Sequence, residues 1–203
     1  MMDDEGERHR AKMVRRKAVQ DAEVASKSVV EKGLLMVHTG AGKGKSTAAW
    51  GLLLRTLGHG KRAAVVQFIK GAWSTGERTA LERLGGNLLQ WRTMGEGFTW
   101  ETQDRERDVR ACGAAWDVAT GFLRDPGLSL LVLDELNIAL RYEYLEEAEV
   151  LAALAARPPM QHVVVTGRNA RPALVEAADL VTEMVAVKHH FAAGVRAQEG
   201  IEF

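Results

Sequence analysis

The chain has 203 residues, of which 46% are hydrophobic, so the sequence is long and apolar enough to bury one sizeable core. Lys plus Arg and Asp plus Glu both number 27, and the net charge of zero gives no general attraction to nucleic acid or to membranes. The one cysteine, Cys112, excludes an intramolecular disulfide. No apolar secretory leader and no apolar run of the roughly 20 residues that a membrane span needs are found. We therefore expect a soluble, cytoplasmic protein.

Residues 1–32 differ in composition from the rest of the chain. The run from Arg8 to Lys17, RHRAKMVRRK, holds six Lys and Arg residues and no acid, although acidic residues flank it. One interpretation is a solvated, partly disordered arm. The other is a basic arm that becomes ordered over an anionic ligand or a partner subunit. The sequence thus predicts a partly flexible N-terminal arm over 1–32, followed by a single domain over 33–203.

From Gly33 onward, β-rich and helical patterns alternate. Apolar runs that predict strands occur at Leu34–Val37, Ala63–Ile69, Leu88–Trp91, Leu128–Leu133, His162–Thr166 and Leu180–Met184. Helical patterns lie between them at Ser46–Leu57, Gly76–Leu84, Arg105–Leu123, Leu145–Ala156 and Arg171–Ala178. Near-continuous apolar runs are typical of strands that are buried on both faces. The alternation predicts an α/β fold with a mostly parallel sheet flanked by helices.

A glycine- and lysine-rich turn follows the first predicted strand. Thr39–Ser46 reads TGAGKGKS, and its end, Gly44-Lys45-Ser46, fits the phosphate-loop pattern G-x-x-x-x-G-K-[ST] between a strand and a helix. Thr39 stands where that pattern has its first glycine, and Gly40 comes one residue later. The predicted ATP-binding residues are Thr39, Gly40, Ala41, Gly42, Lys43, Gly44, Lys45, Ser46, Thr47 and, from a later turn, Arg168.

The residue types of this turn suit a triphosphate. Glycines let backbone N–H groups crowd around phosphate oxygens, and the following helix adds the positive end of its dipole. Lys45 can reach the terminal phosphate oxygens, and the hydroxyl of Ser46 or Thr47 can bind Mg²⁺. The alternative is a glycine-rich turn that binds no ligand.

Paired carboxylates end another predicted strand. Leu130–Glu135 reads LLVLDE, and an acid at this place in phosphate-loop proteins holds Mg²⁺ directly or through water. If the strand stays extended, Asp134 and Glu135 point to opposite sides, and one of them faces the metal. The alternative is a surface turn whose acids cap the next helix. Together with the loop, these residues predict a nucleoside triphosphate with Mg²⁺ (or Mn²⁺) as the ligand.

Three further stretches bear on the reaction. The segment MGEGFTWET places Phe98 and Trp100 two residues apart in a glycine-flanked loop, which suits either a flat ligand or ordinary packing. Gln67, in VQFIKG, comes near a predicted strand end, where ligands bind in open α/β sheets. Arg168, in VTGR, follows another strand and contacts either the nucleotide or only solvent.

Six ordered segments resemble one family, the ATP:corrinoid adenosyltransferases of the cobalamin pathway. They are HTGAGKGKSTAAWG, VVQFIKGAW, MGEGFTWET, LLVLDELNIALRYEYL, VVVTGRNARPALVEAADLVTEM and VKHHFAAGVRAQEGIEF. The resemblance covers roughly residues 33–203 and includes the offset first glycine. Within the family it points to the branch that acts on cob(I)yrinic acid a,c-diamide and cob(I)alamin.

The resemblance implies a RecA-like phosphate-loop fold, a homodimer and a defined reaction. A cob(I) corrinoid attacks the 5′ carbon of ATP and expels inorganic triphosphate, so the loop holds the leaving group and the nucleotide sits reversed relative to ordinary phosphate-loop enzymes. Lys45, the loop amides and the metal ion then stabilise the triphosphate charge.

The resemblance also implies roles for individual residues. Those matching Ser46 and Glu135 bind Mg²⁺, and those matching Phe98 and Trp100 lie against the lower face of the corrin, where they favour a four-coordinate Co(II) that is easier to reduce. A reductase or flavin is implied as the electron donor. The basic arm is implied to fold over an active site of its own or of the neighbouring subunit.

Three other functions compete with adenosyl transfer. A small phosphate-loop kinase or NTPase would release ADP or AMP rather than triphosphate. A nucleotide sensor or corrinoid carrier would keep the loop but could lose the acids, whereas Asp134 and Glu135 are both present. Nucleic-acid binding through the basic arm is disfavoured by the zero net charge and by the absence of a recognised nucleic-acid module.

Overall fold

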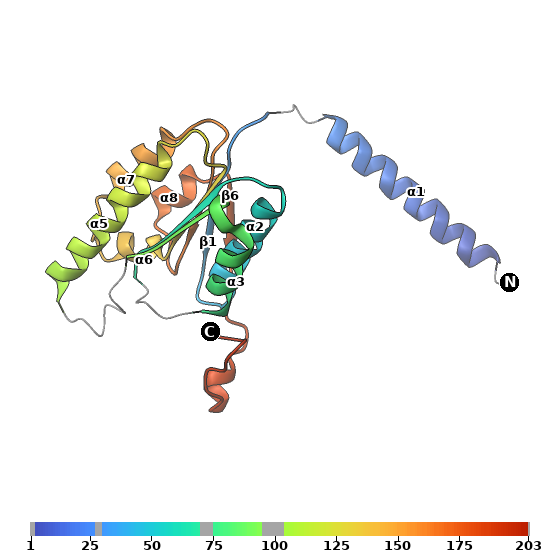
Figure 1. Ribbon diagram of the computed structural model, residues 1–203. Coiled ribbons are helices and arrows are strands. Elements are labelled where there is room, and N and C mark those ends of the chain that lie inside the picture. The colour runs from blue at the N-terminus through green and yellow to red at the C-terminus, as the bar shows by residue number, and fades with distance from the viewer. Residues whose placement is uncertain (1–2, 27–29, 70–74, 95–103, 203) are drawn as a thin grey trace. The chain divides into compact units, whose positions relative to one another are not determined.

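The computed structural model of the chain describes residues 3–26, 30–69, 75–94 and 104–202 (Figure 1). The chain divides into two compact units, Met1–Glu31 and Lys32–Phe203. The described part of the first unit is dominated by one helix. The second unit is a layered α/β domain.

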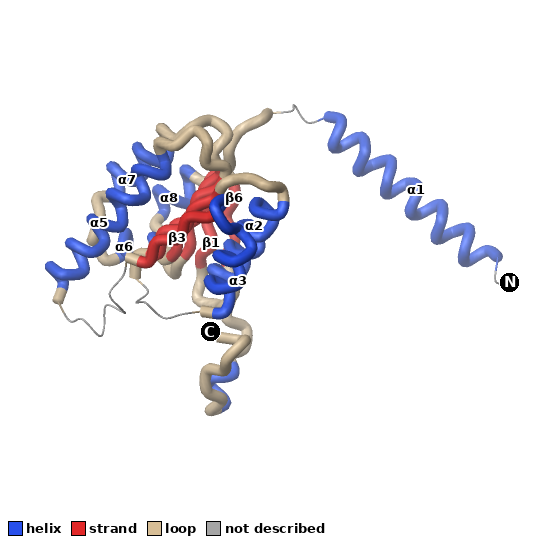
Figure 2. Tube along the Cα trace, viewed as in Figure 1, coloured by secondary structure: helices blue, strands red, loops and turns tan. Residues whose placement is uncertain are grey.

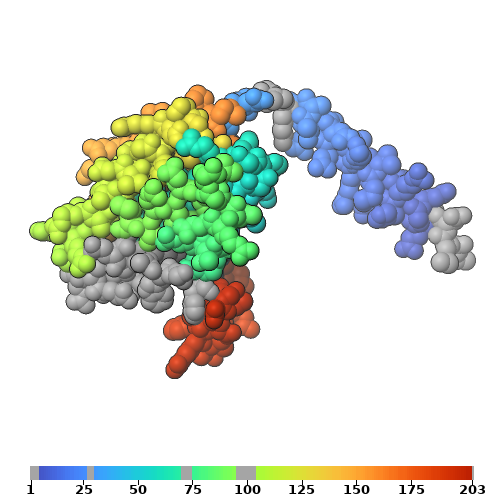
Figure 3. Space-filling view, viewed as in Figure 1, coloured from blue at the N-terminus to red at the C-terminus, as the bar shows by residue number. Residues whose placement is uncertain are grey.

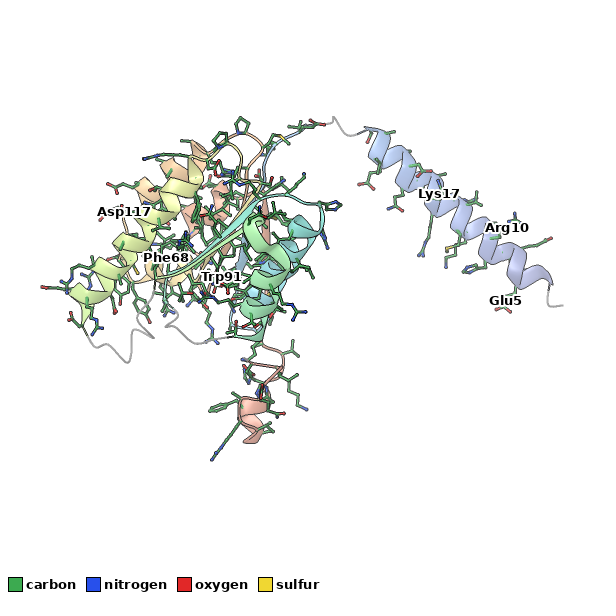
Figure 4. The ribbon with its side chains drawn as sticks, in the orientation of Figure 1. Glu5, Arg10, Lys17, Phe68, Trp91 and Asp117 are labelled. Carbon is green, nitrogen blue, oxygen red and sulfur yellow. The ribbon has the colours of Figure 1, made fainter. Side chains whose placement is uncertain are left out.

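Helix α1 spans Asp3–Ser26. Its side chains from Glu5 onward are exposed, and Lys17 Nζ lies 2.7 Å from Asp21 Oδ2 one turn away. Figure 4 shows Glu5, Arg10 and Lys17 projecting outward from this helix. The arm, which the sequence analysis distinguished by its charge, is helical over most of its length. Opposite charges four residues apart support such an exposed helix.

Six strands form one sheet in the order β3-β2-β4-β5-β1-β6, and every pairing between neighbours is parallel. Figure 2 shows the strands, in red, between the helices of this unit. The strands are β1 (Leu35–Thr39), β2 (Ala63–Gln67), β3 (Leu89–Thr93), β4 (Leu130–Asp134), β5 (His162–Thr166) and β6 (Leu180–Glu183). This sheet confirms the predicted mostly parallel α/β fold and is consistent with a RecA-like arrangement.

Helices cover both faces of the sheet. Their bounds are α2 (Lys45–Gly58), α3 (Gly76–Gly85), α5 (Arg105–Leu123), α6 (Leu136–Arg141), α7 (Glu147–Ala155) and α8 (Pro172–Ala177), with 3₁₀ turns η1 (Gly86–Leu88) and η2 (His190–Ala193). Figure 1 shows α2 and α3 on one face and α5 to α8 on the other. Parallel strands need such crossover helices, which is why both faces are covered.

Two hydrophobic cores lie on the two faces. Successive strand residues point to opposite sides, so Leu35 and Val37 join the core beneath α5 to α8, whereas Met36 joins the core beneath α2 and α3. Phe68 belongs to the first core and Trp91 to the second, and both are labelled in Figure 4.

Strand β6 differs from the prediction of buried strands. All four of its residues are exposed, including Leu180 at 47% and Val181 at 38%. The reason is its position, because β6 is an edge strand that pairs only with β1 among the described strands. An apolar run therefore predicted the strand but not its burial.

The parallel pairing brings the carboxyl ends of all six strands to one edge of the sheet, and four of them matter for the site. Strands β1, β2, β4 and β5 end at Thr39, Gln67, Asp134 and Thr166. In open α/β sheets, ligands bind outside this carboxyl edge. The fold thus places the phosphate loop, which follows β1, beside the acidic end of β4.

Candidate functional site

A cavity of about 230 Å³ opens at the carboxyl edge of the sheet. Its walls come from the phosphate loop, the first turns of α2 and α3, the turns after β4 and β5, and the end of the chain. The lining residues are Gly42, Lys43, Gly44, Lys45, Ser46, Thr47, Trp50, Gln67, Thr75, Glu77, Glu135, Arg168, Ile201 and Glu202. The structure thus gathers seven of the ten predicted ATP-binding residues around one cavity.

The other three predicted ATP-binding residues lie at the root of the loop and do not line this cavity. The hydroxyl of Thr39 accepts a hydrogen bond from Ala170 N at 3.0 Å, so it ties β1 to the turn after β5. Gly40 is buried and Ala41 is exposed. Their contact with a nucleotide stays a prediction.

The loop leads directly into a helix whose N-terminus faces the cavity. Gly44 caps α2 with φ of 108°, a left-handed conformation that glycine adopts at little cost. The first N–H groups of a helix have no partner within the helix, and the helix dipole makes this end positive. The first turn of α2 contains no acid that would offset this. The arrangement therefore favours an anion beside Lys45, Ser46 and Thr47.

Lys45 is held inside the loop. Its side chain is 8% exposed, and Nζ donates hydrogen bonds to the carbonyl oxygens of Gly40, at 2.9 Å, and Gly42, at 2.6 Å. Burial lowers the pKa of Lys45, and the neighbouring charges of Arg168 and Lys43 lower it further, while Glu135 opposes the shift. An anionic ligand would raise the pKa of Lys45 again, because a nearby negative charge favours the charged ammonium.

Asp134 lies behind the cavity wall as a fully buried acceptor. Its Oδ1 accepts hydrogen bonds from Ser46 Oγ and Thr166 Oγ1, each at 2.7 Å, and its Oδ2 accepts one from Gln67 Nε2 at 3.0 Å. The hydroxyl of Thr166 in turn accepts from Glu135 N at 3.0 Å. Asp134 therefore orients the Ser46 hydroxyl, rather than lining the cavity itself.

Glu135 lies at the cavity while Asp134 does not, but the reason differs from the expected alternation along a strand. Strand β4 ends at Asp134, and Glu135 adopts a left-handed conformation with φ of 64°. A non-glycine residue in this region is uncommon and marks a tight turn. Gly167 allows the close approach, since a Cβ there would lie 3.1 Å from Glu135 Oε2.

These residues suit a magnesium or manganese ion bound together with phosphates. Hard divalent cations prefer oxygen ligands, and the Ser46 hydroxyl and Glu135 carboxylate supply them at the cavity. Within the described ranges no group of three or more His, Cys, Asp or Glu side chains could hold a metal ion. A nucleotide-bound Mg²⁺ takes its remaining ligands from phosphate oxygens and water, so one or two protein oxygens are enough.

The end of the chain forms one wall that the sequence analysis missed. Figures 1 and 3 show the segment after β6, in red, running beyond the sheet, and Figure 1 shows its end turning back. Met184 O accepts from Gly42 N at 2.6 Å, and Glu202 forms an ion pair with Lys43. Hydrogen bonding from Lys43 lowers the pKa of Glu202. The pairing joins residues 159 positions apart, so no local pattern could reveal it.

Phe98 and Trp100, the predicted corrinoid-binding residues, lie outside the described residues. Their role stays a prediction. The strand that leads to them, β3, ends at Thr93 within the described part of the chain. No helix that the structure describes is long and apolar enough to cross a membrane.

Comparison with known proteins assigns the chain to a family. Residues 31–203 match the family model described as ATP:corrinoid adenosyltransferase BtuR/CobO/CobP, and residues 1–24 match a model described as Cob(I)alamin adenosyltransferase N terminal.

Individual relatives agree with the family match. The chain is 57% identical to a corrinoid adenosyltransferase of Pseudomonas aeruginosa over 97% of this chain and 96% of the relative. A corrinoid adenosyltransferase of a Sinorhizobium species is 53% identical over 97% of this chain and 92% of its own length. The corrinoid adenosyltransferase CobA of Salmonella typhimurium is 47% identical, with 97% and 98% covered. The chain therefore belongs to the ATP:corrinoid adenosyltransferase family.

Proposed function

We propose that the chain transfers the 5′-deoxyadenosyl group of ATP to the cobalt of a cob(I) corrinoid and releases inorganic triphosphate, a step of adenosylcobalamin synthesis. The observation that carries this proposal is the phosphate loop, whose Lys45 and helix N-terminus border the same cavity as Glu135, in a chain of this family. The geometry supports a triphosphate site, and the family supports what is done with the triphosphate.

The bond changes balance without a proton transfer. The electron pair of cob(I) forms the bond between cobalt and C5′, and the pair of the breaking C5′–O bond leaves on triphosphate. Charge therefore grows on the bridging oxygen and the phosphates. Lys45 and the N-terminal amides of α2 are placed to stabilise it. This requires the nucleotide to lie with its triphosphate in the loop and its C5′ turned toward the corrinoid.

A magnesium or manganese ion would supply Lewis-acid stabilisation of the same leaving group. Ser46 and Glu135 are the residues that we propose to bind it. Asp134 would contribute by fixing the Ser46 hydroxyl, because both of its oxygens already accept hydrogen bonds from protein donors.

Phe98 and Trp100 are proposed to lie against the lower face of the corrin. Displacing the lower ligand there would make Co(II) easier to reduce by one electron from a reductase or a reduced flavin. Trp100→Ala is then expected to slow the reaction from cob(II) with a reductant more than the reaction from pre-reduced cob(I). Equal losses in the two assays would contradict this role.

The arm and the assembly are proposed by the same resemblance. We propose a homodimer in which the arm, residues 1–32, folds over an active site of its own or of the neighbouring subunit. Its six basic residues between Arg8 and Lys17 would favour an anionic triphosphate nearby. Chromatography with light scattering, with and without Mg-ATP, tests the dimer.

Product analysis tests the function directly. The protein is incubated anaerobically with Mg-ATP and reduced cob(I)alamin, cobinamide or the a,c-diamide precursor, and the phosphate product is identified by phosphorus NMR. A light-sensitive adenosylated corrinoid with triphosphate is expected. ADP or orthophosphate with an unchanged corrinoid would instead indicate a phosphate-loop kinase or NTPase.

A further inference from the structure

Gln67, at the end of β2, connects the phosphate loop to the neighbouring strand β3. The side chain is 6% exposed and forms three hydrogen bonds. Its Nε2 donates to Asp134 Oδ2 at 3.0 Å, and its Oε1 accepts from Trp91 Nε1 at 2.9 Å and from Thr93 Oγ1 at 2.8 Å. Its backbone oxygen also accepts from Met94 N at 3.0 Å. One residue therefore bridges β4 and the last residues of β3.

The orientation of the amide is fixed by its partners. The indole N–H of Trp91 is only a donor, so it must face the amide oxygen, and an ionised Asp134 is only an acceptor, so it must face the amide nitrogen. Trp91 itself is held by Trp50 of α2, whose ring centroid lies 4.7 Å away. If the amide of Gln67 were rotated by 180°, its N–H₂ would face the N–H of Trp91, donor against donor. Its oxygen would then face the carboxylate of Asp134, acceptor against acceptor. The network therefore admits one arrangement.

This arrangement determines which carboxylate oxygen of Asp134 accepts the hydrogen bond from Ser46. With Oδ2 occupied by Gln67, Oδ1 receives the hydroxyl protons of Ser46 and Thr166. Because the Ser46 proton points to Asp134, its lone pairs are left for a ligand on the cavity side. Partners of this kind, which orient a metal ligand without touching the metal, contribute substantially to metal affinity.

We propose that Gln67 is a positioning residue that sets the affinity for magnesium-bound ATP through Asp134 and Ser46, and that anchors this chain of contacts on Trp91 and Thr93 of β3. The proposal rests on the proposed function, because it assumes that Ser46 binds the metal ion of the nucleotide. It assigns Gln67 no contact with the reacting atoms. It is tested by binding alone, without a corrinoid.

The first variant is Gln67→Met, which keeps the length of the side chain and removes its hydrogen bonds. ATP binding is measured by calorimetry as Mg²⁺ is titrated, and again with the metal chelated. We expect the Mg²⁺ concentration for half-maximal binding to rise roughly 10-fold or more, with metal-free ATP binding unchanged. The matched control is Gln90→Met, on the half-buried surface of β3, which is expected to leave both quantities unchanged.

A second variant keeps the test decisive if Gln67→Met does not fold. Thr93→Val is nearly isosteric and removes the hydroxyl, which donates to the amide oxygen of Gln67 and also accepts from Arg78 Nη1 at 3.2 Å. A smaller rise in the Mg²⁺ requirement is expected, and Thr182→Val on the exposed strand β6 serves as its control. An unchanged Mg²⁺ requirement in the folded variants overturns the proposal.

A double-mutant cycle separates positioning from general loosening of the site. If Gln67 acts through Ser46, the combination of Gln67→Met with Ser46→Ala costs little more than Ser46→Ala alone, whereas the combination with Lys43→Met is additive. Additivity in both cycles contradicts the proposed route. If the protein binds Mg-ATP as described but forms no adenosylated corrinoid, the proposed function fails while the role of Gln67 stands.

Discussion

Among single residues, Lys45 is the side chain that we propose to stabilise the leaving triphosphate. Its ammonium group donates to two loop carbonyls. A triphosphate oxygen would be a stronger partner than a carbonyl oxygen, because its negative charge attracts the ammonium group directly. The lysine lines the cavity in which we propose that the triphosphate binds.

Lys45→Ala is expected to lower kcat/KM for ATP by roughly 100- to 1,000-fold, the range found when one donor to a developing negative charge is removed. Steady-state kinetics with cob(I)alamin provide the measurement. Lys43→Ala is the control, and a much smaller loss is expected because Lys43 is exposed and paired with Glu202. Similar losses in the two variants would contradict the role assigned to Lys45.

The lowered pKa of Lys45 predicts how ATP affinity depends on pH. The bound triphosphate raises this pKa relative to the ligand-free protein, so binding takes up a proton wherever free Lys45 is neutral. Affinity is then constant at low pH and falls as pH rises through the ligand-free pKa, which lies below 10.5. Calorimetry across this range tests the slope. Lys45→Arg is expected to abolish the fall, because a guanidinium stays charged.

The sequence alone predicted which residues lie together where the motif is local, but not where the contacts join distant parts of the chain. Gly44, Lys45 and Ser46 were predicted from eight adjacent residues and do border the cavity. Asp134 was predicted as a metal residue, but its burial behind Ser46 depends on Gln67 and Thr166 from other strands. Nor could residue order show that Glu135 leaves the strand in a left-handed conformation.

Among the structural elements, the segment after β6 contacts the phosphate loop at two residues, Gly42 and Lys43. The Gly42 N–H, a group expected to face phosphate, donates instead to Met184 O at 2.6 Å. A Cβ on Gly42 would lie 2.7 Å from that same oxygen, so the glycine is required by the close approach of this segment. The end of the segment then brings the carboxylate of Glu202 to Lys43.

Glu202→Gln is expected to lower the KM for ATP by roughly two- to fivefold, on the scale of an exposed ion pair. The change removes a negative charge that competes with triphosphate for Lys43. Glu199→Gln, an exposed site on the same segment, controls for the change in net charge. An unchanged or higher KM for Glu202→Gln would mean that the carboxylate does not compete with the nucleotide.

Most strands and helices could be predicted from the sequence, but helix α6 and the exposure of strand β6 could not. The apolar runs predicted all six described strands to within a few residues because each is one short apolar segment flanked by turns. Helix α6 was missed because its six residues are too few to show a helical period. The exposure of β6 and the order of the strands depend on pairing across the sheet, which a single run of residues does not encode.

In the tertiary structure of the second unit, Asp179 binds two residues near the start of that unit, Lys32 and Leu35. This residue precedes β6 and forms an ion pair with Lys32. Its Oδ2 accepts a hydrogen bond from Leu35 N at 2.9 Å and lies 3.9 Å from Arg157 Nη2. The hydrogen bond from Lys32 is the main cause that lowers the pKa of Asp179 below 3.8. The entry of the chain into β1 is thereby joined to the connections that flank β5 and β6.

Asp179→Asn is expected to lower Tm at neutral pH. Because the folded-state pKa is depressed, the carboxylate stabilises the fold fully above pH 3.8 and loses this contribution as pH falls through the folded-state pKa. The difference in Tm between variant and parent is thus expected to shrink on acidification. Asp117→Asn, at an exposed position of α5 labelled in Figure 4, should show no such trend. A difference independent of pH would exclude the charge as its cause.

We propose that the phosphate loop holds a leaving group rather than a group to be transferred, and one isotope experiment distinguishes the two. ATP is labelled with oxygen-18 at the oxygen that bridges C5′ and the α-phosphorus, and is turned over with cob(I)alamin under anaerobic conditions. Mass spectrometry then locates the label. We expect the label in inorganic triphosphate, because adenosyl transfer breaks the C5′–O bond. Retention of the label in a nucleoside or nucleotide product would show that a P–O bond breaks, and would contradict adenosyl transfer.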